Sequence, residues 1–168
     1  MNIGVDMEKK LEVATFAAGC FWGVEEAFRK LPGVHDTESG YTGGSKATPT
    51  YEEVCTGKTG HAESVRVEFD PKKISYGRLV DAFFGMHDPT TKNRQGLDIG
   101  AQYRSAIFFK SKAQENEAKK AIAALGKSKK YGRPIVTEVT PAGEFWPAEE
   151  YHQKYMQKHS DAACQICP

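Results

Sequence analysis

Apolar side chains recur along the chain with two spacings, and each spacing predicts one type of secondary structure. Between residues 64 and 70, Val65, Val67 and Phe69 alternate with polar residues, which predicts a half-buried strand. Apolar residues over 21–31 follow helical spacing and stop before a Pro-Gly pair, which predicts a helix. The same criteria predict strands over 12–17, 34–41, 104–110 and 135–140, and helices that start at Ser75, at Ser111 (with Gln114 at capping-box spacing) and over 148–158.

These elements follow the order β-α-β, β-α-β and then α-β-α. The first six match a split βαβ unit, so we expect an α+β fold, a ferredoxin-like plait with long loops and a C-terminal extension. Residues 1–168 are expected to form a single catalytic domain, with 159–168 as a mobile redox tail. Two long loops, 42–62 and from His87 to Tyr103, are rich in glycine and polar residues. We expect them to be ordered and to converge on one face.

The composition is that of an ordinary globular domain. The 168 residues are 39% hydrophobic and 27% charged, and 23 basic against 22 acidic side chains give a net charge of +1. No global field attracts nucleic acid, and no apolar run approaches the roughly 18 residues that cross a bilayer. We therefore expect no nucleic-acid or membrane partner, and we expect a monomer.

Residues 7–20 faintly resemble a secretory signal that ends at a lipidation cysteine. Glu12 and Thr15 interrupt the apolar stretch, however, and it is barely long enough for the roughly 7–15 residues that a signal requires. We therefore expect a cytoplasmic protein. In that compartment cysteines stay reduced, so a cysteine cluster indicates chemistry rather than cross-links.

Cys20 is the first candidate for that chemistry. It stands between a predicted strand and a predicted helix, after Gly19, which permits a tight turn. The unpaired N–H groups of a helix start stabilise a thiolate and can bring a cysteine pKa from about 8.5 toward neutrality. Phe21 and Trp22 add apolar surface beside the sulfur, suited to an uncharged substrate group. The alternative is a buried cysteine that acts as a small hydrophobe, which is our expectation for Cys55.

Cys164 and Cys167 form a C-x-x-C pair near the end of the chain. With His152 and His159 they could bind zinc as part of a binding module, although the usual ligand spacings are not met. A tail with two thiols could instead reach an oxidised Cys20 and resolve it. The second reading fits a protein that already holds a reactive thiol.

Glu63 lies where the first long loop enters the strand 64–70. An inward carboxylate there would have a raised pKa and could act as a general acid. Tyr51 and Tyr103 each lie on one long loop and could donate hydrogen bonds without carrying charge. A solvated edge charge at Glu63 and ordinary packing of the two tyrosines are the alternatives.

Other enzymes with a cysteine nucleophile offer a rival interpretation. In a cysteine hydrolase His61, His87 or His152 could serve as the base, and no local signature distinguishes them. A thiol peroxidase would also use Cys20. Neither enzyme needs Glu63 together with the tail cysteines.

Six motifs occur in an order and at separations that resemble one known family, the A-type peptide methionine sulfoxide reductases. The resemblance runs from about Thr15 to Tyr155. Each motif alone is weak, but together they are highly specific. The motifs are GCFWG (19–23), GYTGG (40–44), PTYEEVC (49–55), GHAE (60–63), HDP (87–89) and RQG followed by DIGAQYRS (94–96 and 98–105).

The resemblance implies a role for each candidate. Cys20 would attack the sulfoxide sulfur and become a sulfenic acid, and Glu63 would protonate the departing oxygen. Tyr51 and Tyr103 would donate hydrogen bonds to that oxygen. Phe21 and Trp22 would form the aromatic cage around the substrate methyl, and Asp98 would be a polar residue of the same site.

The resemblance also implies the substrate and the reductant. Family members act on the S epimer of methionine sulfoxide, free or in proteins, and are usually recycled by thioredoxin; no cofactor and no metal is expected. No B-type domain is present in the sequence, so the R epimer should be left untouched. For the resolving step we favour Cys164 as the first attacker, with Cys167 opening the resulting disulfide.

Overall fold

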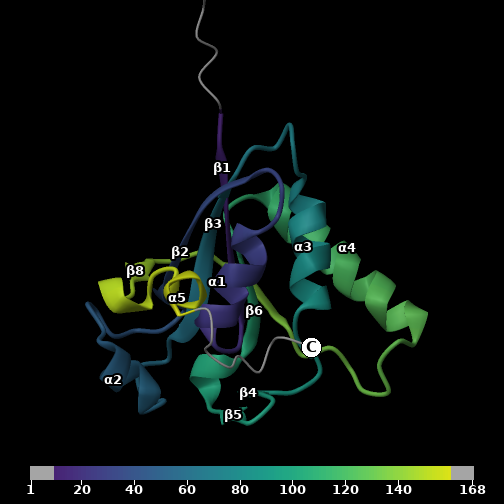
Figure 1. The fold of residues 1–168 in the computed structure, drawn as a ribbon. Helices are drawn as coiled ribbons and strands as arrows, with labels where there is room; N and C mark the ends of the chain where they lie inside the picture. The colour runs from purple at the N-terminus through teal and green to yellow at the C-terminus, as the bar shows by residue number, and fades with distance from the viewer. Residues whose placement is uncertain (1–9, 160–168) are drawn as a thin grey trace, which may run out of the picture.

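The computed structural model describes residues 10–159 as a mixed α+β fold on a six-stranded sheet (Figure 1). The strand order is β7-β6-β1-β3-β2-β8, and every pairing is antiparallel except the one between β6 and β7. The α+β class is thus confirmed. In chain order the elements are β1 (Glu12–Ala18), α1 (Phe21–Arg29), β2 (Val34–Thr42), α2 (Tyr51–Cys55), β3 (Ala62–Phe69), α3 (Tyr76–Gly85), the hairpin β4 (Arg94–Gln95) and β5 (Asp98–Ile99), the 3-10 helix η1 (Ala101–Tyr103), β6 (Ser105–Phe109), α4 (Lys112–Ser128), β7 (Glu138–Pro141), β8 (Trp146–Pro147), the 3-10 helix η2 (Glu150–His152) and α5 (Tyr155–Lys158).

β1 lies inside the sheet and is covered on both faces, and its last five residues are all buried. Phe16 faces the helices and stacks on Phe28 of α1 and Phe83 of α3, at centroid distances of 4.9 and 5.3 Å. Ala17 faces the other side, in a smaller cluster with Phe108. Packing on both faces fixes the end of β1, and with it the residues that follow.

The helix starts agree with the expectation from sequence, with one difference. Ser75 caps α3, since its hydroxyl accepts a hydrogen bond from the backbone N–H of Arg78. Ser111 caps α4 in the same way, but the predicted capping box is only half formed. The Gln114 amide instead accepts from the Lys110 N–H and donates to the carbonyl of Val13. These two hydrogen bonds connect α4 to β1.

The loop predicted over 42–62 contains a short helix, α2. Thr50 and Glu53 form a full capping box at its start, each side chain accepting from the other residue's backbone N–H. The predicted convergence of the two loops is confirmed, because the side chain of Gln102 donates to the carbonyl of Cys55. α2 and η1 therefore lie together.

The prediction of one helix over 148–158 is wrong: η2 and α5 are separate turns. Lys154 has φ of 53°, a left-handed conformation that interrupts an α-helix. Its backbone N–H donates instead to the buried carboxylate of Glu25, at 2.7 Å. The strand predicted over 135–140 begins at Glu138, because Val136 donates to the carbonyl of Pro89 rather than to β6. Within residues 10–159, no helix has the length and apolarity to cross a membrane.

Candidate active site

Cys20 lies at the junction predicted from the sequence, between β1 and α1. Gly19 turns the chain with φ of 95°, and Cys20 is the N-cap of the nine-residue helix. The side chain is partly exposed. The turn at Gly19, the N-cap position of Cys20 and the buried end of β1 therefore hold the thiol at the helix start. The helix macrodipole favours a thiolate there.

The Glu63 carboxyl is buried directly beside this helix start. Its side chain is 2% exposed, and Oε1 accepts a hydrogen bond from the Phe21 N–H at 3.2 Å. Oε2 is buried and has no hydrogen-bond partner among the described residues. Burial raises the pKa of Glu63 to about 8, the Phe21 N–H opposes the shift, and the charge of Asp98 adds to it. Glu63 is therefore the inward carboxyl that the sequence predicted, and it is mostly protonated at neutral pH.

Tyr51 and Tyr103 come from the two converging loops. Burial is the first cause that raises the pKa of each phenol, and the charge of Glu63 raises both further. For Tyr103, the charges of Asp98 and Cys20 act in the same direction. Such electrostatic couplings require the groups to be close together. The two tyrosines therefore lie with Cys20, Glu63 and Asp98 at one end of β1 and β3. Both phenols keep their protons.

The aromatic wall beside Cys20 is more extensive than the sequence indicated. Phe21 is buried, whereas Trp22 is partly exposed and stacks on Tyr155 at a centroid distance of 3.7 Å and an interplanar angle of 7°. The Trp22 indole N–H donates to Nδ1 of His152 at 2.9 Å. His152 is fully buried and also contacts Tyr51 at 4.4 Å. It therefore holds two of the predicted site residues.

Each candidate histidine has its ring lone pair committed elsewhere, which argues against a cysteine hydrolase. Nδ1 of His61 accepts from the Gly44 N–H, and Nε2 of His87 faces the hydroxyl of Ser105 while its Nδ1 donates to a carbonyl. Burial lowers the pKa of His87 to about 4 and also lowers that of His152. His152 already accepts from an indole, so none of the three has a free lone pair for a thiol proton.

Residues 146–158, here called the C-terminal strap, cross the site and tie its parts together. Glu149 accepts hydrogen bonds from the Tyr41 hydroxyl at 2.9 Å and from the Tyr51 N–H at 3.1 Å. Lys154 pairs through its ammonium with the buried carboxylate of Glu25, at 3.2 Å. Glu25 and Glu149 are not among the site residues predicted from the sequence. Most of their partners lie about 100 positions or more away along the chain, beyond the reach of a local pattern.

Cys55 differs from its prediction, since it is exposed rather than buried. It lies one helical turn after Tyr51, and the two side chains are hydrogen-bonded. The tail cysteines Cys164 and Cys167 lie outside the described residues. Within residues 10–159, no cluster of three or more His, Cys, Asp or Glu side chains could hold a metal ion.

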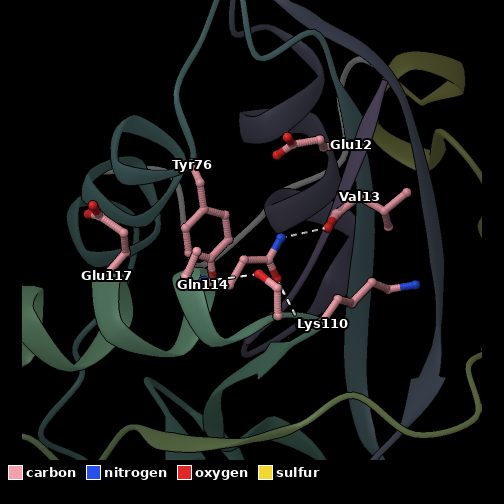
Figure 2. Close-up of a pocket in the computed structure, with 8 residues that line it drawn as sticks. Glu12, Val13, Tyr76, Lys110, Gln114 and Glu117 are labelled. Carbon is pink, nitrogen blue, oxygen red and sulfur yellow. Dashed lines mark hydrogen bonds between the residues drawn. The ribbon is translucent and has the colours of Figure 1, made fainter. Parts of the chain in front are cut away.

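A cavity of about 460 Å³, drawn in Figure 2, shares no lining residue with this site. It opens at the start of β1, whereas Cys20 follows its end. Its lining includes Glu12, Tyr76 and Gln114, and Figure 2 shows the Gln114 amide reaching the carbonyl of Val13. It contains neither a thiol nor a histidine, so the chemistry belongs to the Cys20 site.

Comparison with known proteins points to one family. Residues 12–168 match the family model for peptide methionine sulfoxide reductase. The peptide methionine sulfoxide reductase MsrA of Methanoculleus marisnigri is 58% identical over 157 residues, which cover 94% of this chain and 96% of that protein. Reduced Mxr1 from Saccharomyces cerevisiae superposes with a TM-score of 0.87 at 38% identity, over 94% of this chain and 91% of that one. Mxr1 in complex with Trx2 matches with a TM-score of 0.62 at 29% identity, over 92% and 86%.

Proposed function

The chain belongs to the peptide methionine sulfoxide reductase family, and from that premise we propose a role for each group at the Cys20 site. The reaction is the thiol-dependent reduction of methionine sulfoxide to methionine, with thioredoxin as the recycling partner. The observation that carries the proposal is Glu63. Its carboxyl has a pKa of about 8, an unpartnered oxygen and a hydrogen bond to the residue next to Cys20.

In the first step the Cys20 thiolate attacks the sulfoxide sulfur. Glu63 gives its proton to the sulfoxide oxygen, which is a poor leaving group until protonated. The protonated oxygen then transfers from the substrate sulfur to the Cys20 sulfur as the S–O bond and the newly formed S–S bond break, which leaves Cys20 as a sulfenic acid. The cysteine sulfur is oxidised by two electrons and the substrate sulfur is reduced by two, so methionine leaves.

The other residues orient the substrate. The hydroxyls of Tyr51 and Tyr103 donate hydrogen bonds to the oxygen, since both remain protonated. Phe21 and Trp22 surround the substrate methyl with apolar surface, and Asp98 supplies a polar contact at the edge of the site. Family resemblance supports the S epimer as the substrate.

In the second step a tail thiol attacks the sulfenic acid and releases water, leaving a disulfide with Cys20. We assign this attack to Cys164, after which Cys167 opens the disulfide and leaves a terminal pair for thioredoxin to reduce. The relative Mxr1 has been solved in complex with Trx2, which supports a thioredoxin partner. The assignment of the two cysteines rests on their order in the sequence.

We also infer the finer architecture and setting. The order β6-β1-β3-β2, with antiparallel neighbours, supports a ferredoxin-like plait that forms one catalytic domain. The predicted redox tail, 159–168, lies outside the described residues except for His159. We also propose that the protein acts as a monomer. A thiol nucleophile recycled by thioredoxin supports the cytoplasm, where cysteines are kept reduced.

The test is a single turnover with each epimer of a methionine sulfoxide peptide and no added reductant. Cys20→Ser should yield no methionine from either epimer, because an alcohol cannot replace a thiolate at neutral pH. Cys55→Ser, the matched control, should yield up to two equivalents from the S epimer, because the proposed relay frees the Cys20 thiol once without added reductant. Methionine formation by Cys20→Ser would remove Cys20 from the mechanism.

A further inference from the structure

Three large apolar side chains remain exposed among residues 10–159, and all border the proposed active site. Leu97 is 78% exposed, Ile99 69% and Tyr151 53%. Single exposed apolar residues are common on protein surfaces and need no explanation. These three differ because they gather around one site instead of being scattered.

Leu97 and Ile99 flank Asp98 on the β4–β5 hairpin, which lies at the same end of the sheet as α2 (Figure 1). Asp98 turns inward: burial raises its pKa, and its charge acts on Glu63 and Tyr103. Leu97 belongs to the turn between the two strands and Ile99 follows Asp98 in β5, and both side chains are mostly exposed whereas Asp98 is partly buried. Leu97 and Ile99 therefore form its outer edge.

The hairpin is anchored rather than loose. The Gln95 amide exchanges two hydrogen bonds with the backbone of Asp88, and the Thr91 hydroxyl donates to the Arg94 carbonyl. The Gly100 N–H donates to the carbonyl of Asn93 and closes the base of the hairpin. These bonds hold the apolar edge outward, so a ligand meets it without ordering a flexible loop.

Tyr151 approaches the same site from a different element. It belongs to η2 in the C-terminal strap, and its ring contacts His152 at 4.1 Å. The His152 ring in turn lies 4.4 Å from the ring of Tyr51 at the start of α2, which places Tyr151 near that helix. The hairpin and η2 thus border the site from two directions.

We propose that Leu97, Ile99 and Tyr151 form an apolar rim that binds the residues flanking an oxidised methionine in a polypeptide, so that apolar segments in extended conformation are the preferred substrates. This inference rests on the proposed function of the Cys20 site. A polypeptide whose sulfoxide enters that site must lay its neighbouring residues across the rim, because consecutive residues advance only about 3.3–3.6 Å.

The size of the rim favours this occupant over a folded partner. A stable interface between globular proteins covers about 800 Å² on each side, far more than three side chains supply. Two or three apolar residues of a bound segment match it. The experiment must distinguish this occupant from two others, a second copy of the chain and thioredoxin.

The test compares three substrates of S-sulfoxide configuration in single-turnover rate against substrate concentration, without thioredoxin. These are a hexapeptide with leucines flanking the sulfoxide, the same peptide with serines, and N-acetylmethionine sulfoxide amide. For the double variant Leu97→Ser/Ile99→Ser, kcat/KM on the leucine peptide should fall about tenfold, which corresponds to about 1.4 kcal/mol of lost apolar burial. The serine peptide and the amide should change less than twofold, and Ala123→Ser on the exposed face of α4 should leave all three unchanged.

Leu97→Lys gives an independent test by gain of preference. It should raise kcat/KM for a peptide with flanking glutamates relative to the serine peptide, since the new ammonium faces the flanking residues. Equal losses on all three substrates, or no loss on any, would overturn the proposal, as would a loss that appears only when thioredoxin-supported turnover is measured in parallel. Failure of the wild type to reduce even the amide would instead refute the proposed function.

Discussion

Replacement of Glu63 by glutamine should increase the free energy of unfolding relative to the wild type as the pH rises. The same substitution removes the proton donor. The substitution preserves the shape of the side chain and an oxygen that can accept from the Phe21 N–H. It removes only the ionisation. Any change in stability that depends on pH can therefore be assigned to the carboxyl.

The sign follows from the raised pKa. The ordinary value of 4.5 applies to the unfolded chain, and burial raises the pKa in the folded state to about 8. Between these values the folded protein binds the extra proton, so the free energy of unfolding falls as the pH rises. At 1.36 kcal/mol per pH unit, the wild type should lose about 4 kcal/mol relative to Glu63→Gln between pH 5 and pH 9.

The assay is urea unfolding of both proteins at pH 5, 7 and 9, with the difference in free energy of unfolding as the readout. Glu53→Gln is the control of opposite sign. The Thr50 N–H lowers the pKa of Glu53, so its difference from wild type should close below pH 4.5 and should not grow from pH 5 to 9. A Glu63→Gln difference constant within about 1 kcal/mol would refute the reasoning, because Glu63 would then be ionised at neutral pH. In single turnover, Glu63→Gln should form sulfenic acid about 10²–10⁴-fold more slowly.

Substitutions at His152 and at the two tail cysteines test the surroundings and the resolution of the nucleophile. His152→Leu removes the acceptor of the Trp22 indole and should raise KM about tenfold with little change in the maximal single-turnover rate, whereas His152→Gln should restore most of the affinity; equal effects of both variants would contradict the role of the acceptor. Cys164→Ser should keep one equivalent of methionine per enzyme but lose thioredoxin-supported cycling, and Cys167→Ser should trap a Cys20–Cys164 disulfide detectable by peptide mass mapping. A disulfide from Cys20 to any other cysteine would contradict this order.

The parts of the fold that the sequence predicts correctly depend on neighbouring residues. The turn at Gly19, the cap at Ser75 and the alternation in β3 are determined within a few positions, and all three are confirmed. The missed helix α2 carried a local signal as well, the Thr50 and Glu53 spacing of a capping box.

The errors arise where distant residues decide the backbone. Residues 148–158 have helical periodicity, yet Glu25, 129 positions away, draws the Lys154 N–H out of a helix. Likewise the role of His152 depends on an indole 130 positions away. The periodicity of a short stretch of sequence carries no information about such distant contacts. Cys20 and Glu63 could therefore be predicted as candidates, whereas the roles of Glu25 and His152 could not.

The anchored strap also fixes the position of His159, the last described residue. Tyr155 stacks on Trp22, and its ring centroid lies 4.4 Å from that of His159, so His159 lies on the Trp22 side of the site. Only five positions separate His159 from Cys164, a span of at most about 18 Å. A tether this short gives an attached thiol an effective concentration in the millimolar range, whatever the concentration of the enzyme. If the sulfenic acid is resolved as proposed, this proximity favours the disulfide over a second oxidation to the irreversible sulfinic acid. The buried pair of Glu25 and Lys154 then contributes to this protection, because it fixes the strap from which the five-residue tether starts.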